Sequence, residues 1–286
     1  MNNIHLIESK KDFDDLCLKL KKEKQIALDT EFERRYTYFA KLSIIQIGIR
    51  SGKKYVIDVL KIEDISAFKD ILLDNNILKI IHSLYQDIEI FYHLFGVVAV
   101  NLYDTQTAAL AVKLGKSISY SELVKQICNV VLNKDMQKCN WIKRPLSKEQ
   151  IEYAAADVEY SFEIYDYLSF QMRKLHTEEL FKSMMIKHHH RDTYAINYKD
   201  IWKKVSFHHK SDRLVTNMQM LAALREEIAV HENIPRSHAL SDSDLVSIAE
   251  KLPTTISMLD KLKIDSKAMK HVKYKNKIIT CCVGLR

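Results

Sequence analysis

The sequence predicts an α/β fold, in which a mixed sheet is covered by helices and followed by a smaller domain built of helices alone. Short strand-like runs come first, strand and helix signals then alternate, and residues 211–286 carry helix signals only. The 286 residues include 5 glycines and 3 prolines, a scarcity that favours helices over many-turned β architectures.

The first predicted strands lie close together in the sequence. Residues 26–31 open with an apolar run and end in acids, whereas residues 42–49 and 55–59 are rich in β-branched side chains. Because the connections between them are short, we expect an antiparallel meander.

Strand and helix signals alternate after this point. We expect strands at 78–81 and 97–100 and helices at 64–73, 84–95 and 104–114. Two further helices begin at Ser119-x-x-Glu122 and Ser147-x-x-Gln150, which both fit a capping box. The second of these helices should run from about residue 148 to residue 174.

Changes in composition predict the domain boundaries. Residues 1–175 carry the α/β pattern, residues 176–210 are polar and basic, and residues 211–286 are helical. We therefore expect an α/β domain, a basic linker and a small helical domain. The linker contains His188-His189-His190, which we expect to be solvated, because neighbouring side chains diverge and no cysteine or carboxylate framework accompanies them.

Charge and cysteine content narrow the class of protein. Lys and Arg number 44 against 37 Asp and Glu, and a net charge of +7 is compatible with a polyanionic partner without establishing one. The five cysteines form no Cys-x-x-Cys pair, so we expect reduced thiols.

No apolar run approaches the ~20 residues of a membrane helix, and the N-terminus lacks a signal-peptide core. We expect a cytoplasmic monomer with no membrane partner.

Two acids on the first strand are candidate metal ligands. Asp29 and Glu31 are two positions apart, so they project from one face of the strand. Oxygen ligands of this kind suit Mg²⁺ or Mn²⁺. Taken alone, the pair is more typical of solvated acids at a strand end.

Two helices carry further candidates. Tyr153 and Asp157 stand four apart and share a helix face, although a half-buried tyrosine beside a surface acid would give the same pattern. Asp87 lies in the first turn of its helix, where a carboxylate is favoured by the helix dipole. Asp104 precedes another helix, and we expect it to cap that helix.

Cations and aromatic rings follow the first strand. Arg34, Tyr36 and Tyr38 are candidate substrate contacts that would grip a phosphate or stack on a terminal base. Surface or core filling is the alternative interpretation.

These signals occur together with characteristic flanking sequences. The segments are DTEFERRYTYFAKLSIIQI, KIIHSLYQDIEIF, YDTQTAALAV, ISYSELV, RPLSKEQIEYAAADV and MLAALREEIAVHENIPRSHALSDSDLVSIAEKLP. The first five, within residues 4–170, resemble the ribonuclease D branch of the DEDD exonuclease superfamily. The sixth resembles the HRDC domain that accompanies such exonucleases.

The resemblance implies a ribonuclease H-like fold and a two-metal site. Asp29 and Glu31 match the first acidic motif, Asp87 the second and Asp157 the third, while Tyr153 matches the residue that defines the tyrosine-type branch. The four carboxylates would hold two divalent cations, Mg²⁺ or Mn²⁺. Tyr153 would orient the attacking water.

The activity implied is that of a 3′→5′ exoribonuclease that trims tRNA precursors and other small structured RNAs. A 3′→5′ DNA exonuclease is an alternative, because the same metal site serves both polymers, and so is a catalytically inactive RNA-binding scaffold. The chain departs from the family pattern in having one HRDC-like domain where some relatives have two. It also has Asn140 where we expect Asp.

Overall fold

The structure, a computed structural model, describes residues 3–207 and 211–286. It contains two compact units. The sheet unit comprises the chain up to Glu33 together with Lys41–Tyr194, and the helical unit comprises Arg34–Ala40 and Ala195–Arg286. Among the described residues, no helix has both the length and the apolar character needed to cross a membrane.

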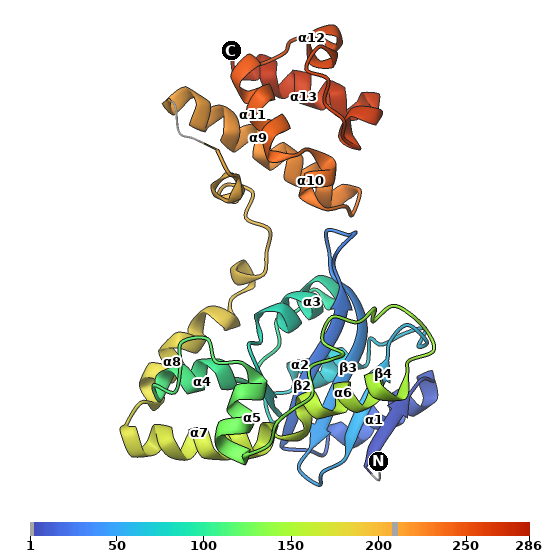
Figure 1. The fold of residues 1–286 in the computed structure, drawn as a ribbon, viewed down its shortest axis with the longest axis vertical. Helices are drawn as coiled ribbons and strands as arrows, with labels where there is room; N and C mark the ends of the chain where they lie inside the picture. Colours follow the sequence, from blue (N-terminus) through green and yellow to red (C-terminus); the bar gives the residue numbers. More distant parts are fainter. Residues whose placement is uncertain (1–2, 208–210) are drawn as a thin grey trace. The chain divides into compact units, whose positions relative to one another are not determined.

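A six-stranded mixed sheet forms the centre of the sheet unit (Figure 1). β2, β3 and β4 are antiparallel, which confirms the predicted meander, whereas β1 pairs with β4, and β5 with β2 and β6, in parallel. The strand order is β1-β4-β3-β2-β5-β6. The strands are β1 (Ile4–Ile7), β2 (Gln25–Glu33), β3 (Lys41–Ile49), β4 (Lys54–Asp58), β5 (Leu78–Ile81) and β6 (Leu102–Asp104).

Helices cover the sheet and continue the sheet unit to its C-terminal end. Two short 3₁₀ helices, η1 (Ile186–His189) and η2 (Arg191–Thr193), follow the last of them. The helices are α1 (Lys10–Leu20), α2 (Phe68–Leu73), α3 (Tyr85–Phe95), α4 (Thr105–Ala111), α5 (Tyr120–Cys128), α6 (Lys148–Glu159), α7 (Ser161–Leu175) and α8 (Glu178–Met185).

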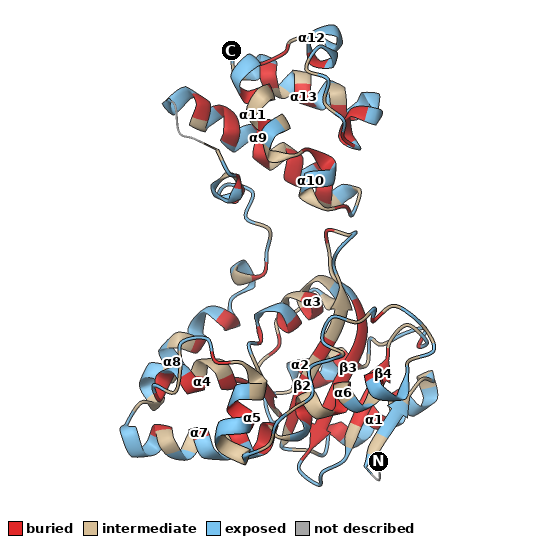
Figure 2. Ribbon diagram, in the orientation of Figure 1, coloured by how far each residue is buried: buried red, intermediate tan, exposed pale blue. Residues whose placement is uncertain are grey.

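α6 lies across the antiparallel strands on one face of the sheet (Figure 1). Ala154 and Ala155 of α6 pack against Ile44 of β3 in a buried cluster. A Cβ atom added to Gly48 would lie 3.1 Å from the carbonyl oxygen of Val158, so a larger residue there would push the helix away. Small side chains thus bring α6 close to the strands. These strands are among the most buried parts of the unit (Figure 2).

The helical unit has a hydrophobic core of its own. Its elements are η3 (Ile201–Lys204), α9 (Asp212–His231), α10 (Arg236–Ala239), α11 (Asp242–Lys251), α12 (Ile256–Asp260), η4 (Ala268–Lys270) and α13 (Val272–Gly284). The capping box at Ser241 and Asp244 fixes the start of α11. Buried Glu226 pairs with Arg236, and buried Arg225 pairs with Asp242.

The strand predicted at residues 97–100 is absent from the structure, and that prediction is wrong. The N–H of Val100 donates to the carbonyl of Leu72 instead of joining a ladder. Asn101 then takes a positive φ of 51°, and β6 begins at Leu102. The apolar run reflects core packing, because Ala99 is buried.

The single helix predicted for residues 148–174 is two helices. Tyr160 leaves the helical conformation at φ −102° and ψ 9°. Its N–H donates to the hydroxyl of Tyr120 over 3.0 Å. The capping box at Ser147 is complete, whereas at Ser119 the hydroxyl accepts from the third helical N–H without the reciprocal bond.

The region predicted as a basic linker is shared between the units. The sheet unit extends to Tyr194, and η3 belongs to the helical unit. Buried apolar side chains anchor this segment although charged residues dominate its composition, among them Met185, Tyr194, Ile201 and Val205. Residues 208–210 of this region lie outside the described residues.

Candidate active site

The end of β2 presents two carboxylates to the face that α6 covers. Asp29 is opposite Gln46 of β3, and Glu31 is opposite Ile44, which packs under α6. The register shifts by one residue directly after Glu31. Such a bulge ends regular pairing and re-aims the side chains beside it. Both carboxylates therefore point toward the helix.

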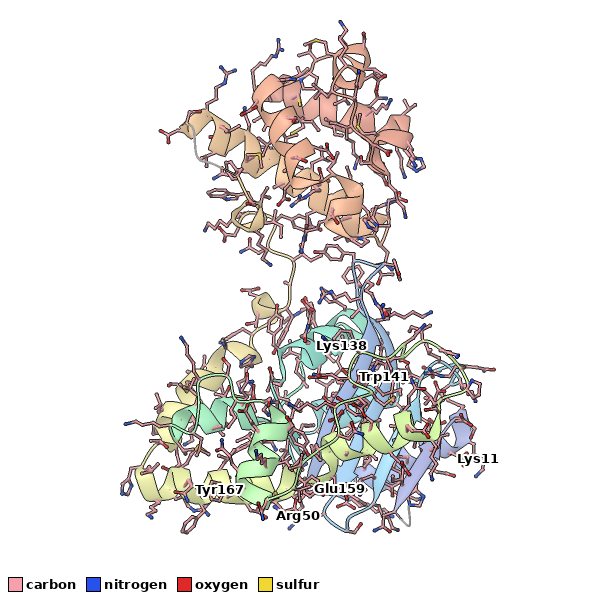
Figure 3. All side chains as sticks on the ribbon, viewed as in Figure 1. Lys11, Arg50, Lys138, Trp141, Glu159 and Tyr167 are labelled. Carbon is pink, nitrogen blue, oxygen red and sulfur yellow. The ribbon has the colours of Figure 1, made fainter. Side chains whose placement is uncertain are left out.

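α6 places Tyr153 and Asp157 one turn apart above these acids. The completed capping box at Ser147 and Gln150 fixes the first turn of the helix and so the direction of both side chains. The ring of Tyr153 lies 6.0 Å from that of Trp141, centroid to centroid. Trp141 precedes α6 along the chain (Figure 3).

Asp87 reaches the cluster from α3. The hydroxyl of Thr30, which points away from Asp29 and Glu31, donates to Asp87 Oδ1 over 2.5 Å. This bond connects the first turn of α3 to the acidic end of β2. Asp87 is buried, whereas the other four candidate residues, Asp29, Glu31, Tyr153 and Asp157, are partly exposed, so the cluster is open to solvent.

Burial raises the pKa of every carboxylate in the cluster, and the charges of the other members raise it further at Asp29 and Glu31. Burial, followed by the charges of Asp87, Asp157 and Glu31, raises the pKa of Asp29 well above its usual range. Burial and then the charge of Asp157 raise the pKa of Glu31 to about 9. Burial also raises the pKa of Asp87 and of Asp157 to about 7. The structure thus brings the four predicted acids into one electrostatic cluster from three elements.

The donor set of this cluster fits a hard divalent cation. Within residues 3–207 and 211–286, no group of three or more His, Cys, Asp or Glu side chains is arranged to hold a metal ion. The cluster nevertheless consists of carboxylate oxygens, the ligands that Mg²⁺ and Mn²⁺ prefer. Because their pKa values are raised, a positive charge nearby would favour the ionised form of these carboxylates.

Tyr153 is suited to donate a hydrogen bond. Burial, and next the charges of Asp157, Glu31 and Asp29, raise the pKa of its phenol above the usual value. The phenol therefore keeps its proton at neutral pH. Burial raises the pKa of Asp157, and a hydrogen bond with Tyr153 lowers it in part.

A buried ion pair holds the loop that leads into α6. Arg144 donates from Nε and Nη2 to the two oxygens of Asp58 at the end of β4, over 2.6 and 2.7 Å. Its Nη2 also donates to the carbonyl and the hydroxyl of Ser43. In the same loop the side chain of Asn140 accepts from the N–H of Ile142, which gives this residue a turn-forming role.

The three predicted substrate contacts lie in different environments. Tyr36 is 71% exposed, and Arg34 Nε donates to the carbonyl of Tyr38 over 3.3 Å. Tyr38 is buried in the core of the helical unit, where its hydroxyl donates to Glu226. Its ring is therefore not available for stacking on a base, and its partner Glu226 is 188 positions away in the sequence.

The remaining predictions are resolved by local contacts. Asp104 caps α4 by accepting from the N–H groups of Gln106 and Thr107, as expected. His188 is buried and its carbonyl accepts from the hydroxyl of Tyr194, so the expectation of a solvated side chain is wrong there. All five cysteines are free thiols.

Sequence reasoning missed the contributions of Thr30 and Arg144. The hydroxyl of Thr30 donates to Asp87, although the sequence pattern assigns Thr30 no role. Arg144 belongs to a recognised motif, yet its partner Asp58 is 86 positions away. The signal in both cases is a polar residue in an apolar context, and its partner becomes evident only in three dimensions.

Two family models match most of the chain. One described as a 3′-5′ exonuclease matches residues 4–173, and one described as an HRDC domain matches residues 217–282. Ribonuclease D of Jannaschia sp. is 32% identical over 265 residues, covering 91% of this chain and 68% of that protein. Ribonuclease D of Bartonella henselae is also 32% identical, over 90% of this chain and 64% of that protein.

Solved structures agree with these matches. The crystal structure of Escherichia coli RNase D aligns with a TM-score of 0.88 and 27% identity, covering 99% of this chain and 75% of that one. The catalytic core of RRP6 from Trypanosoma brucei shares the fold, with a TM-score of 0.75. The chain spans about two thirds of the length of the curated relatives named above. It belongs to the ribonuclease D family of 3′→5′ exonucleases, hydrolases that here combine an exonuclease domain with a C-terminal HRDC domain.

Proposed function

We propose that this chain is a 3′→5′ exoribonuclease that works with two divalent cations and trims the 3′ ends of tRNA precursors and other small structured RNAs. The observation that carries the proposal is the cluster of four carboxylates beside Tyr153. Burial raises the pKa of all four acids, and the charges of their neighbours add to this at Asp29 and Glu31, so these acids would not gather at a solvent-open site for stability alone.

The proposal assigns each acid a role in holding the cations. Asp29, Glu31 and Asp157 would hold one, and Asp29 with Asp87 the other, so Asp29 contributes to both. When bound, two such cations activate water as the nucleophile and relieve charge on the leaving 3′ oxygen. The bond from Thr30 would hold the carboxylate of Asp87 in one position next to β2. Tyr153, which stays protonated, would donate to the attacking water and orient it.

RNA is the proposed polymer because of the relatives. The Escherichia coli protein is described as an exoribonuclease involved in structured RNA processing. The net charge of +7 supports a polyanionic substrate. Exposed Tyr36 is the proposed aromatic contact for a terminal base, with Arg34 beside it in the sequence.

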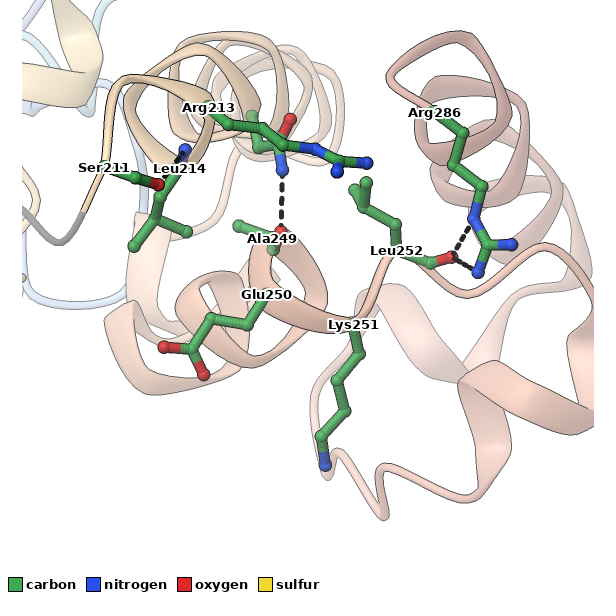
Figure 4. A pocket seen from close by; sticks show the side chains of 9 residues that line it. Ser211, Arg213, Leu214, Ala249, Glu250, Lys251, Leu252 and Arg286 are labelled. Atoms are coloured by element: carbon green, nitrogen blue, oxygen red, sulfur yellow. Dashed lines mark hydrogen bonds between the residues drawn. The ribbon is translucent and has the colours of Figure 1, made fainter.

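The helical unit would contribute phosphate contacts. A cavity of about 540 Å³ is lined by Arg213, Lys251 and Arg286, together with Glu250 (Figure 4). Arg286 is partly engaged, since it donates to the carbonyl of Leu252. Other basic residues are less suited, because Arg225 is buried against Asp242 and Lys203 is paired with Asp200. Lys210 lies outside the described residues.

One experiment tests the activity and the choice of polymer. The protein is incubated with a 3′-extended tRNA and with single-stranded DNA of matched sequence, in Mg²⁺, Mn²⁺ or EDTA, and the products are followed as a ladder. We expect stepwise shortening of the RNA from its 3′ end with either metal and none in EDTA. Faster shortening of the DNA would assign the site to DNA, and binding without cleavage would indicate an inactive scaffold.

A further inference from the structure

Gln46 is a buried amide beside the acidic cluster. Its side chain has no solvent-exposed surface, and neither Oε1 nor Nε2 has a hydrogen-bond partner. In the part of the chain that the structure describes, it is the one side chain whose buried donor and acceptor both lack partners. A buried amide without partners opposes folding, so its presence in the middle of a strand requires an explanation.

The register of the sheet places this amide next to Asp29. Gln46 of β3 is directly opposite Asp29 of β2, and directly opposite residues on antiparallel strands share a face, with Cβ atoms about 4.5–5.5 Å apart. The two neighbours of Gln46 on this face, Ile44 and Gly48, both lie under α6. The amide is therefore enclosed by β2 and by the turn of α6 that carries Tyr153 and Asp157.

Among residues 3–207 and 211–286, no side chain donates a hydrogen bond to Asp29. A backbone hydrogen bond from Thr30 favours its ionised form, whereas burial and three neighbouring carboxylates oppose it. An amide N–H is a neutral donor that can serve a carboxylate without adding charge. Across a directly opposite pair, whose Cβ atoms lie about 4.5–5.5 Å apart, a glutamine amide is long enough to approach a carboxylate.

We propose that Gln46 is a positioning residue, whose Nε2–H group donates to the carboxylate of Asp29 and fixes its orientation toward Glu31 and Asp157. This inference rests on the proposed function, because the orientation of Asp29 matters only if its carboxylate binds the cations. Donors of this kind orient metal-binding carboxylates, and their loss typically lowers metal affinity or activity about 10–100-fold.

The test replaces the amide with an apolar side chain of nearly equal length. Gln46→Met removes the donor and keeps the volume. Gln106→Met is the matched control, because the amide of Gln106 donates to the carbonyl of Ile118 over 3.0 Å and not to a carboxylate assigned to the cations. For each variant we would measure Tm in EDTA, Mn²⁺ affinity without RNA by the spin-resonance signal of free Mn²⁺, and kcat and KM for RNA.

The expected result separates stability from function. Gln46→Met should leave Tm in EDTA unchanged or raised, because the proposed bond to Asp29 serves the cation site and the amide has no partner in the core of the sheet. Its Mn²⁺ affinity and kcat should each fall about 10-fold or more, with KM for RNA unchanged. Gln106→Met should lower Tm while its Mn²⁺ affinity and kcat stay at the wild-type level.

Two results would overturn the inference. If Gln46→Met raises Tm and leaves Mn²⁺ affinity and kcat unchanged, the amide is a core residue without a role in the site. If it lowers Tm as much as Gln106→Met does, the amide has a structural partner. Weaker Mn²⁺ binding in Gln46→Met, combined with a wild-type protein that cleaves no RNA, would refute the proposed function and leave the inference standing.

Discussion

Asp29 is the residue on which the proposed mechanism depends most. Its carboxylate interacts with those of Glu31, Asp87 and Asp157, and it is assigned to both cations. Asp29→Asn should abolish turnover and preserve the fold, because the amide keeps the shape of the side chain and removes its charge. Hydrolysis rates with circular dichroism as the fold check would measure this. Asp166→Asn, which changes an exposed acid on α7, is the control. Asp29→Asn activity within about threefold of wild type would refute the assignment.

Tyr153 should contribute less than a metal ligand. As a protonated donor that orients water, it is expected to accelerate hydrolysis by about 10²–10⁴-fold, the usual range for a positioned proton-transfer partner. Tyr153→Phe should therefore slow hydrolysis at saturating RNA by that factor and leave the Kd for RNA unchanged. The opposite outcome, weaker binding at an unchanged saturated rate, would make the tyrosine a substrate contact.

The raised carboxylate pKa values predict how stability depends on pH without metal. Burial raises the pKa of Asp87 and Asp157 to about 7, against about 3.9 for Asp in an unfolded chain. Between these two values the folded state binds more protons than the unfolded state, so their contribution to the free energy of unfolding is largest at low pH. It is lost as the pH rises through about 7.

Thermal unfolding can measure this dependence. In EDTA, the contribution of the two acids to Tm should fall between about pH 5 and pH 8, so Tm of wild type should fall relative to that of an Asp87→Asn, Asp157→Asn double variant. Added Mg²⁺ should raise the wild-type Tm more at the higher pH, because it binds the ionised carboxylates. A larger Mg²⁺ effect at the lower pH would contradict the cation site.

At the scale of elements, the loop before α6 depends on one buried ion pair. Asp58 has no exposed side-chain surface and Arg144 is 17% exposed. Arg144→Met should lower the free energy of unfolding by about 3–5 kcal/mol, because it leaves the carboxylate buried without a partner. Arg50 makes the same two-bond contact with Asp166, but at 44% and 55% exposure. Arg50→Met should therefore change stability by about 1 kcal/mol or less. Equal losses in urea unfolding would show that burial does not set the difference.

Local pattern predicts the strands that carry the site better than the helices around it. β2, β3, β4 and β5 lie where the sequence places them, because period-two patterns and turn residues act over a few positions. The break at Tyr160 could not be predicted, since it depends on a hydrogen bond that its N–H donates to the hydroxyl of a residue 40 positions away. The role of apolar residues 97–100 likewise depends on packing.

The site itself was predicted as a set and not residue by residue. Taken singly, Asp29 and Glu31 are typical of a strand end, and Asp87 is typical of a helix start. The prediction of a catalytic site depends on the order of these residues and on the segments that flank them. The structure brings these acids together, whereas their catalytic roles stay a prediction. The orphaned amide of Gln46 could not be found from sequence, because its burial depends on how closely α6 approaches β3.

At the scale of the whole molecule, the two units predict a division of labour. Every proposed catalytic group lies in the sheet unit, so a chain that ends at Tyr194 should keep metal-dependent cleavage of short single-stranded RNA. Its affinity for a tRNA precursor should fall. The log–log salt dependence of Kd should flatten by about 0.7 for each lost phosphate contact with a single strand.

Substitution of two cavity residues provides the matched control for this truncation. Arg213→Gln with Lys251→Gln removes two charges from the cavity and keeps the helical unit. The Kd of this variant, measured at several salt concentrations, should show a flatter slope at unchanged Tm. A slope equal to that of wild type in both proteins would remove the RNA-binding role of the helical unit. Joint loss of Tm and short-RNA cleavage in the truncated chain would instead indicate that the unit only supports the fold.

The loop that carries Tyr38 has a consequence for the order in which the protein is made. Arg34–Ala40 belongs to the helical unit, although the rest of that unit begins at Ala195. The ribosome therefore synthesises this loop more than 150 residues before Glu226, the acid that accepts from its tyrosine. Until then Tyr38, a core residue of the helical unit, has no core to pack into, while the strands that precede and follow its loop can already form the sheet. The helical unit is completed only by the last part of the chain, and a fragment that begins at residue 195 would leave Glu226 without one of its two partners.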